Sequence, residues 1–311
     1  MQKSNLTDLF DEETQKELEG FGKVLLIDFH NLVYKNVFTA VHFNPEDNEE
    51  FFVWRHLMFN NIMTTIQKFQ PEKVILAVDT KGSWRYDFFD GYKSKRKGTR
   101  DGAAVDFEKF FPILSEFIID LQKTFSTIYT IRLPRTEGDD IIATLINKKF
   151  KSNTEVVIVS SDRDMNQLMT NPNVKQYDPV AGKFLESINP RKELAIKILS
   201  GDRSDSIPPI KRLVGPVRAE KILKEGFRTW LDSVEDEIER GQIESNFIRN
   251  KKLIDLSEIP EDIENEIINT YDTYQISPID GSKLMSFFGK NRLIKHMEEW
   301  QNCSEFIKAL I

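Results

Sequence analysis

Lys23-Val-Leu-Leu-Ile-Asp-Phe29 and Lys73-Val-Ile-Leu-Ala-Val-Asp79 are two short apolar segments that each carry an aspartate at or next to the C-terminal end. Both are rich in strand-forming residues and have the length of a single strand. A helical pattern over about residues 49–69 lies between them. The order strand, helix, strand is typical of a parallel sheet whose connecting helix packs on one face.

The same alternation continues to about residue 160. A second helical pattern over about residues 107–124 leads into Thr127-Ile-Tyr-Thr-Ile131, then into a helix that opens at Glu137, and then into Glu155-Val-Val-Ile-Val-Ser160. The last of these has the continuous apolar pattern of a buried strand. We therefore predict an α/β fold with a mainly parallel central sheet and helices on both faces.

Helical patterns dominate after Pro190, where the strand patterns end. This change predicts a smaller helical C-terminal domain. The predicted divisions are an N-terminal arm (residues 1–22), an α/β domain (residues 23–189) and a helical C-terminal domain (residues 190–311).

The composition is that of a globular protein, with 40% hydrophobic and 30% charged residues among 311. No uninterrupted apolar run is long enough to span a bilayer, so we expect a soluble protein without membrane association. The single cysteine, Cys303, excludes an internal disulfide, and no paired Cys and His pattern suggests zinc. A reducing cytoplasm fits these features.

The net charge of −7 argues at first against a nucleic-acid partner. The charge is nevertheless strongly segregated along the chain. Residues 81–100 contain seven Lys or Arg and two acids, whereas residues 232–272 contain thirteen acids and four bases. Such segregation predicts a local positive surface on a protein that is acidic as a whole.

Acidic residues gather where the predicted strands and helices begin or end. Three predicted strands end near an aspartate, and parallel strands present their C-terminal ends at one edge of the sheet, where ligands bind. Further acids open a predicted helix or follow one. The nine candidates are Asp28, Asp79, Glu137, Asp139, Asp140, Asp162, Asp164, Asp202 and Asp205.

Clustered carboxylates repel one another unless cations neutralise them. Hard oxygen ligands without His or Cys partners favour two Mg²⁺ ions, with Mn²⁺ as a substitute, over zinc. Two such ions can drive phosphodiester hydrolysis. The alternative is structural, because acids in a first helical turn often cap it and an aspartate after a strand is often a turn residue. The joint arrangement favours the metal site.

A basic and aromatic segment, Trp84-Arg-Tyr-Asp-Phe-Phe-Asp-Gly-Tyr-Lys-Ser-Lys-Arg-Lys97, follows Asp79. Aromatic rings can stack on unpaired bases while Lys and Arg hold phosphates. We predict that Lys93 and Arg96 neutralise charge that develops on the scissile phosphate. The alternative is a solvated basic helix with a buried aromatic stripe.

Six motifs in order carry a resemblance to a known family. They are L-I-D-F at residues 26–29, V-D-T-K at 78–81, W-R-Y-D-F-F-D-G-Y-K-S-K-R at 84–96, E-G-D-D-I-I-A at 137–143, S-S-D-R-D-M-N-Q-L at 160–168 and G-D-R-S-D at 201–205. As an ordered set they resemble the flap endonuclease and 5′-exonuclease family, in particular its branch of T-even bacteriophage ribonucleases H.

The resemblance implies a PIN-like 5′-nuclease core with a helical arch over about residues 81–106. It assigns Asp28, Asp79, Glu137, Asp139 and Asp140 mainly to a first metal, with Asp162 between the metals, and Asp164, Asp202 and Asp205 mainly to a second. The residues that it implies for nucleic-acid binding are Arg85, Tyr92, Lys95, Lys97, Lys211, Arg212, Arg218 and Lys221.

One element departs from the family pattern, a helix-turn-helix over about residues 202–226. Ser206 and Pro209 stand where cellular members have Asn and Gly. The helix that opens at Pro216 still has the expected pattern, so we predict that this divergent element contacts duplex phosphates.

The family further implies a 5′-3′ nuclease that removes RNA primers and flaps from lagging-strand fragments, bound to DNA and RNA–DNA hybrids. We expect a monomer in the cytoplasm, which is that of a bacterial host if a phage encodes the protein.

Leu6-Thr-Asp-Leu-Phe10 resembles a peptide that binds a sliding clamp. The C-terminal domain is a possible site for a single-strand-binding protein. The alternatives are a PIN-like single-strand ribonuclease and a non-catalytic DNA-binding protein. No phosphate-binding glycine motif follows a strand, which argues against a nucleotide enzyme.

Overall fold

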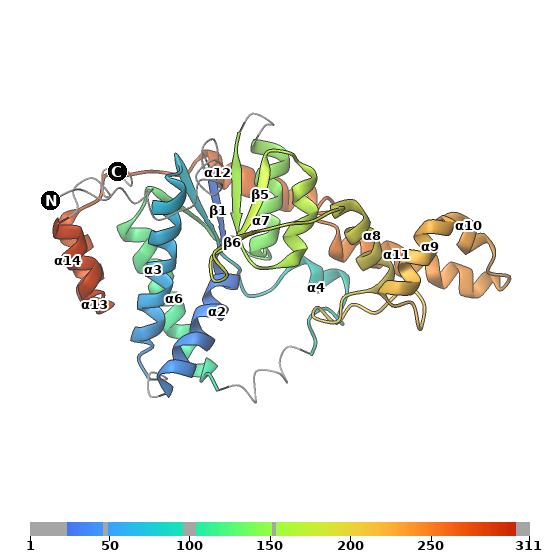
Figure 1. Cartoon of the computed structure of the whole chain (residues 1–311), viewed down its shortest axis with the longest axis horizontal. Helices are drawn as coiled ribbons and strands as arrows, with labels where there is room; N and C mark the ends of the chain where they lie inside the picture. The colour runs from blue at the N-terminus through green and yellow to red at the C-terminus, as the bar shows by residue number, and fades with distance from the viewer. Residues whose placement is uncertain (1–23, 46–48, 96–103, 151–153, 303–311) are drawn as a thin grey trace.

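The computed structural model describes residues 24–45, 49–95, 104–150 and 154–302 (Figure 1). Six strands form one sheet in the order β3-β2-β1-β4-β5-β6, and all neighbouring pairs are parallel except β5 and β6. The strands are β1 (Val24–Asp28), β2 (Lys73–Ala77), β3 (Ile128–Ile131), β4 (Val156–Val159), β5 (Val174–Asp178) and β6 (Lys183–Leu185).

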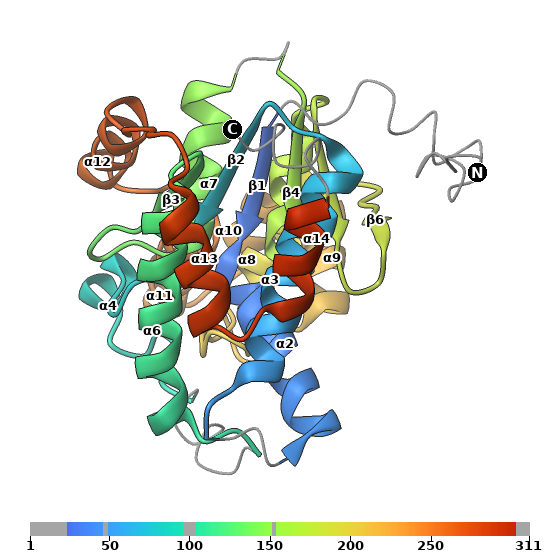
Figure 2. The ribbon, with the colours of Figure 1, turned by 90° about the vertical axis from the view of Figure 1, so that its left-hand side faces the viewer.

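Helices cover both faces of the sheet, which confirms the predicted fold class (Figure 2). Alternate residues of β1 serve opposite cores: Leu25 and Ile27 face one, and Val24 and Leu26 face the other. Burial on both faces explains why this strand is apolar throughout. The first core includes α2 (Phe29–Phe43), α3 (Phe52–Phe69), α6 (Phe107–Thr124) and α13 (Gly281–Lys290), and the second includes α7 (Gly138–Thr144) and α12 (Glu261–Asp272).

A separate group of helices extends beside the sheet (Figure 1). Its own apolar core contains Leu199, Ile210, Ile222 and Leu231. The helices of this group are α8 (Pro190–Ser200), α9 (Pro216–Glu225), α10 (Phe227–Asp232) and α11 (Glu237–Ile254). The remaining elements are α4 (Trp84–Phe88), the π-helix η3 (Leu145–Lys149), the 3₁₀-helix η4 (Arg163–Thr170) and α14 (Ile294–Asn302).

The last helices return to the α/β core, which the predicted division at residue 189 did not anticipate. Ile263 and Ile267 of α12 are buried in the second core, and Leu284 and Phe287 of α13 are buried in the first. Their spacing of three or four residues puts each pair on one side of its helix. The helical region after residue 189 therefore consists of the group α8 to α11 and a C-terminal part that packs on the sheet.

The sheet edge formed by the C-terminal strand ends holds the candidate acids. From β1 the chain adds β2 and then β3 on one side of the sheet. It then returns to the other side of β1, where it adds β4 and then β5. Ligands bind at such a reversal of strand order. Asp28 is the N-cap of α2 and accepts a hydrogen bond from the Asn31 N–H at 3.1 Å.

Within the described residues, no helix is both long enough and apolar enough to cross a membrane.

Candidate metal centre

Five acids from four segments line one cavity of about 310 Å³ at this sheet edge: Asp28, Asp79, Glu137, Asp139 and Asp162. Helix capping and a place in the cavity are compatible, because Asp28, Glu137 and Asp162 are also the N-caps of α2, α7 and η4. Helix capping, which the sequence analysis gave as the structural alternative, is therefore observed for these three residues. Capping places their carboxylates at helix N-termini, whose partial positive charge favours anions.

Gly138 brings two of these segments together. Its N–H donates to Asp79 Oδ1 at 2.7 Å. A Cβ at this position would lie 3.0 Å from the same oxygen and 3.1 Å from the Ala77 carbonyl oxygen, so a larger residue would force the strand end and the helix apart. The glycine of the E-G-D-D motif thus fixes the distance between Asp79 and the start of α7.

Burial and mutual repulsion raise the pKa values of two carboxyls in the cavity. Burial raises the pKa of Asp28 to about 7, with further increases from Asp79 and Asp162. Burial also raises the pKa of Asp139 well above its ordinary value, because the opposing effect of Arg85 is smaller. A divalent cation would stabilise the ionised form of both groups.

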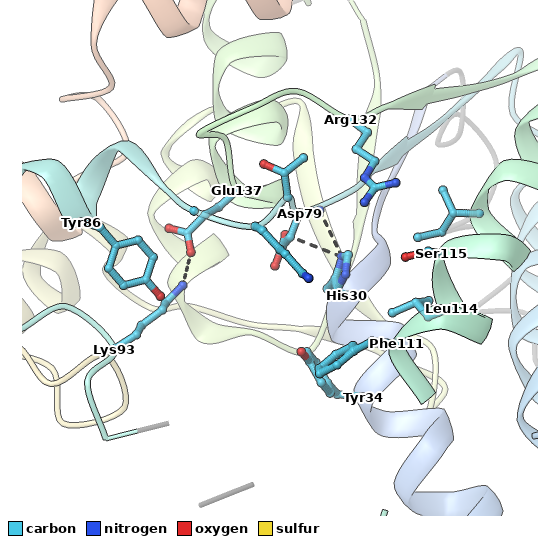
Figure 3. A pocket seen from close by; sticks show the side chains of 14 residues that line it. His30, Tyr34, Asp79, Tyr86, Lys93, Phe111, Leu114, Ser115, Arg132 and Glu137 are labelled. Carbon is cyan, nitrogen blue, oxygen red and sulfur yellow. Dashed lines mark hydrogen bonds and ion pairs between the residues drawn. The ribbon is translucent and has the colours of Figure 1, made fainter. Parts of the chain in front are cut away.

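Glu137 is held ionised by cations from the chain itself. Its Oε2 accepts hydrogen bonds from Arg85 at 2.9 Å and from the Tyr92 hydroxyl at 2.9 Å, and its Oε1 is paired with the Lys93 ammonium. Figure 3 shows Lys93 and Glu137 pointing toward one another across the cavity. Burial alone would raise the pKa of Glu137, but Lys93 and Arg85 lower it to about 2.

Asp140 and Arg85 form a buried pair beneath the cavity. Asp140 is 0% exposed and Arg85 is 1% exposed, and the guanidinium lies 2.8 Å from Asp140 Oδ1. Asp140 Oδ2 also accepts from the Glu137 N–H and the Trp84 indole N–H. Arg85 was expected to bind nucleic acid, but it is enclosed by these carboxylates and the Leu253 carbonyl. Its placement is that of an internal counter-ion. We infer that Asp140 mainly positions Arg85, and its oxygen also lies within 4.8 Å of those of Glu137 and Asp139.

A second group of acids lies nearby. Asp164, Asp202 and Asp205 each offer an oxygen within 4.8 Å of the others, as do Glu137, Asp139 and Asp140 in the first group. The second group joins residues from η4 and from the turn after α8. Tyr92 links the groups, since its hydroxyl lies 2.9 Å from Glu137 Oε2 and 3.2 Å from Asp205 Oδ2.

Lys197 is a residue of this site that the sequence analysis missed. Its ammonium is paired with Asp164 and lies 2.7 Å from Asp202 Oδ2. Burial opposes its charge, but Asp164 and Asp202 raise its pKa. The available signal was its position in the last turn of the helix that precedes Gly201-Asp202.

His30 was also missed, although it stands two residues after Asp28. Its Nδ1 accepts a hydrogen bond from the Asp79 N–H at 3.1 Å and lies 3.9 Å from Asp79 Oδ1 (Figure 3). An accepting Nδ1 assigns the neutral imidazole proton to Nε2. The ring therefore holds the turn after β2 in place.

The cations predicted to contact phosphates lie in two places. Lys95 is exposed, and its N–H donates to Ser206 Oγ at 3.3 Å. Arg212, Arg218 and Lys221 are exposed around the N-terminus of α9, whereas Lys211 is paired with Glu239 at 2.8 Å. Of the other predicted residues, Arg96, Lys97 and the segment Leu6-Thr-Asp-Leu-Phe10 lie outside the described residues, as does part of the predicted arch.

The two groups of acids suit divalent cations on their donor chemistry. All donors are carboxylate oxygens, which Mg²⁺ and Mn²⁺ prefer. Two lysine ammonium groups already lie against these oxygens, Lys93 at the first group and Lys197 at the second. The chain thus places a positive charge at both positions.

Metal binding in the cavity that Asp28 lines is expected to release protons. A protonated carboxyl must lose its proton before it ligates a cation, so affinity for Mg²⁺ should rise with pH through the Asp28 pKa of about 7. Titration calorimetry in two buffers of different ionisation enthalpy should detect net proton release at about pH 6 and little at about pH 8.5. Asp28→Asn is the control and should release fewer protons. Metal binding without proton release at either pH would contradict the assignment.

A mainly parallel sheet whose C-terminal edge gathers carboxylates that could bind divalent cations, beside partly buried lysines, is typical of a metal-dependent phosphodiester hydrolase. Residues 23–203 match the family described as 5′-3′ exonuclease, N-terminal resolvase-like domain, and residues 189–306 match the family described as T4 RNase H, C terminal. The chain belongs to the family of 5′-3′ exonucleases and flap endonucleases.

Individual relatives agree with this membership. Ribonuclease H of Enterobacteria phage T4 is 30% identical over 293 residues, which cover 88% of this chain and 93% of that protein. Thermostable DNA polymerase I of Thermus thermophilus is 27% identical over 214 residues, 67% of this chain and only 24% of the polymerase. A structure of the bacteriophage T5 D15 flap endonuclease in a pseudo-enzyme-product complex with DNA and metal ions has a TM-score of 0.61 at 18% identity. It covers 80% of this chain and 99% of that one, a likeness of fold.

Proposed function

We propose that this protein is a two-metal 5′-3′ nuclease that hydrolyses RNA primers in RNA–DNA hybrids, 5′ ends of duplex DNA and 5′ flaps. The observation that carries the proposal is the cavity in which five carboxylates from four segments meet beside Lys93. Two further findings support the substrate class: the phage T4 relative is named a ribonuclease H, and the T5 relative was crystallised with DNA. Processing of lagging-strand fragments is the biological role that fits these substrates.

The carboxylates would divide between two Mg²⁺ ions. Asp28, Asp79, Glu137 and Asp139 would hold the first, and Asp164, Asp202 and Asp205 the second, with Asp162 between them. Bound ions of this kind supply the Lewis acidity that phosphodiester hydrolysis requires.

Lys93 is the group we assign to the scissile phosphate. Its ammonium lines the same cavity as the acids, so it can offset negative charge that develops on the phosphate. Its N–H donates to the Asp205 carbonyl oxygen at 2.8 Å, which connects the segment after α4 to the loop that carries the second group of acids. The Lys93 backbone has a φ of +51°, in the left-handed region. Such strained residues concentrate at functional sites.

The duplex would contact the exposed cations around α9. A helix N-terminus with nearby Arg and Lys side chains suits backbone phosphates without base specificity. We assign Arg212, Arg218 and Lys221 to this contact, and Lys95 to the strand near the metal centre. Contacts of a sliding clamp with Leu6-Thr-Asp-Leu-Phe10 and of a single-strand-binding protein with the helical region remain sequence-based proposals.

A panel of substrates tests the proposal. The purified protein is incubated with Mg²⁺ and with a 5′-labelled RNA–DNA hybrid, nicked duplex, flapped duplex or single-stranded RNA. Short labelled 5′ products from the hybrid, nick and flap, with little cleavage of the single strand, are expected. Cleavage of single-stranded RNA alone would favour a PIN-like ribonuclease, and binding of all duplexes without cleavage would favour a non-catalytic DNA-binding protein.

A further inference from the structure

The second group of acids depends on a turn that closes on itself. The turn after α8 carries Asp202 and Asp205 and returns at Ile207, which exchanges two backbone hydrogen bonds with Asp202 at 2.9 and 2.7 Å. Pro208 and Pro209 come next, and neither has a backbone N–H. The returning side of the turn therefore offers mainly carbonyl oxygens, and donor groups from another element are needed to hold it in place.

Three polar side chains on one side of α11, which lies beside α8 (Figure 1), supply those donors. Asn246, Arg249 and Asn250 are three and four residues apart, so they lie on the same side of the helix. The Asn250 amide and the Arg249 guanidinium donate to the Pro208 carbonyl oxygen at 2.9 and 3.3 Å. The Asn246 amide donates to the Ile210 carbonyl oxygen at 2.9 Å. Helix α11 thus holds the returning side of the turn.

Arg249 fixes the orientation of the two amides. Its guanidinium donates to Asn246 Oδ1 at 2.7 Å and to Asn250 Oδ1 at 2.9 and 3.1 Å. Because each amide oxygen accepts from the guanidinium, each amide nitrogen is left to donate to the turn. An arginine offers five N–H donors in a rigid fork, a geometry that a lysine ammonium cannot reproduce. Loss of Arg249 would therefore release both amides as well as its own contact with the turn.

Arg249 carries a charge but has neutral partners. Among the described residues no carboxylate pairs with it, and burial lowers its pKa. A charge without a counter-ion costs free energy when it is buried, which favours a role for the geometry of the guanidinium. The guanidinium carbon lies 5.2 Å from the centre of the Phe89 ring. Phe89 follows α4 and packs against the apolar cluster that contains Tyr92 and Ile207, so Arg249 also contacts the segment that leads to Lys93.

We propose that Arg249 is a positioning residue for the second metal ion. Through two asparagines and the Pro208 carbonyl, it fixes the turn that presents Asp202 and Asp205. The inference rests on the proposed nuclease function and names a residue, itself not a metal ligand, on which that function depends. The geometry of this network, and not the charge of Arg249, determines how tightly the second group binds a divalent cation.

Arg249→Met tests the proposal, with Arg228→Met as the matched control. Methionine fills much of the same space and removes every hydrogen bond of the guanidinium. Arg228 also contacts α11, through Glu244 at 2.7 Å, but its side chain is 75% exposed. The probe is Mn²⁺, added to the metal-free protein without nucleic acid, and electron paramagnetic resonance measures its free concentration. Circular dichroism confirms that each variant is folded at the temperature of the titration.

Asp205→Asn identifies the binding step of the second group, because it removes a carboxylate there. Arg249→Met should weaken the same step about 10-fold to 100-fold and leave the other step unchanged, as expected for a partner that orients metal ligands. In the Asp205→Asn background its effect should be much smaller, because two changes that act on one site are not additive. Arg228→Met should bind Mn²⁺ like the wild type.

Three results would overturn the proposal: wild-type Mn²⁺ affinity in Arg249→Met, equal weakening of both steps, or full recovery by Arg249→Lys. The last would show that charge alone is sufficient, since lysine keeps the charge without the fork. If Arg249→Met does not fold, Asn246→Ala replaces it. That variant removes one amide of the network and must weaken the same binding step.

Binding of a flapped duplex in EDTA separates positioning from a direct phosphate contact. A positioning role leaves the affinity of Arg249→Met for the duplex unchanged, because no metal is present. A phosphate contact would lower that affinity and make it less sensitive to salt. Lower duplex affinity with wild-type Mn²⁺ binding would therefore contradict the proposal. Cleavage in Mg²⁺ is scored separately, so a wild type that does not cut refutes the nuclease function and leaves the Mn²⁺ result to decide the role of Arg249.

Discussion

Asp139→Asn is expected to lower the rate of phosphodiester cleavage by at least about 10²–10³-fold while leaving the fold intact. Asp139 lines the metal cavity, and the hydrogen bond that its Oδ1 accepts from the Asp140 N–H at 2.9 Å can also be accepted by an asparagine. The substitution therefore removes a negative charge that a cation needs without removing that contact. Its high pKa in the metal-free protein also means that a neutral side chain is tolerated there.

The adjacent Asp140→Asn is the matched control for this prediction. It removes the same charge one residue further along, from a fully buried carboxylate that pairs with Arg85 and caps the start of α7. We expect Asp140→Asn to reduce the free energy of unfolding and Asp139→Asn to reduce Mg²⁺ affinity and the single-turnover rate. Wild-type activity in Asp139→Asn would remove Asp139 from the metal site.

Arg85→Met is expected to lower the free energy of unfolding by about 3–5 kcal/mol. Arg85 neutralises Glu137 and Asp140 in the interior, and its Nε–H donates to the Leu253 carbonyl at 3.0 Å. Methionine fills part of the space but leaves two buried carboxylates without this partner. Urea denaturation of the metal-free protein measures the effect.

Arg135→Met is the control for the loss of an arginine. Arg135 donates two hydrogen bonds to Asp87, but both side chains are exposed, and pairs of this kind contribute about 0–1 kcal/mol. Equal destabilisation by the two substitutions would show that burial of Arg85 has no special effect.

Much of the sheet was predictable because its central strands are buried on both faces. Residues 23–29 and 73–79 have few polar residues, and this pattern has few other interpretations. Strand β5 was not predicted, since Val-Lys-Gln-Tyr-Asp at Val174–Asp178 lacks a continuous apolar run. Helix α2 was not predicted either, because it begins directly after β1, where no turn residue separates the two elements.

The candidate site was predictable in its residue types and less so in their roles. Acids at strand ends and at the start of a helix were expected to converge, and five of them line one cavity. The partners of each acid depend on side chains distant in sequence, such as Arg85 with Asp140 and Lys197 with Asp202. A basic segment has the same pattern whether its arginine faces solvent or a buried carboxylate, so the burial of Arg85 was not accessible from the sequence.

The most direct test of the central claim is the release of 5′-labelled fragments from flapped duplex DNA by the wild-type protein, with Mg²⁺ or with EDTA. We predict short labelled products with Mg²⁺, none with EDTA, and recovery of cleavage when excess Mg²⁺ is added back. Equal cleavage in EDTA, or tight binding without cleavage in Mg²⁺, would contradict a metal-dependent nuclease at this carboxylate cavity.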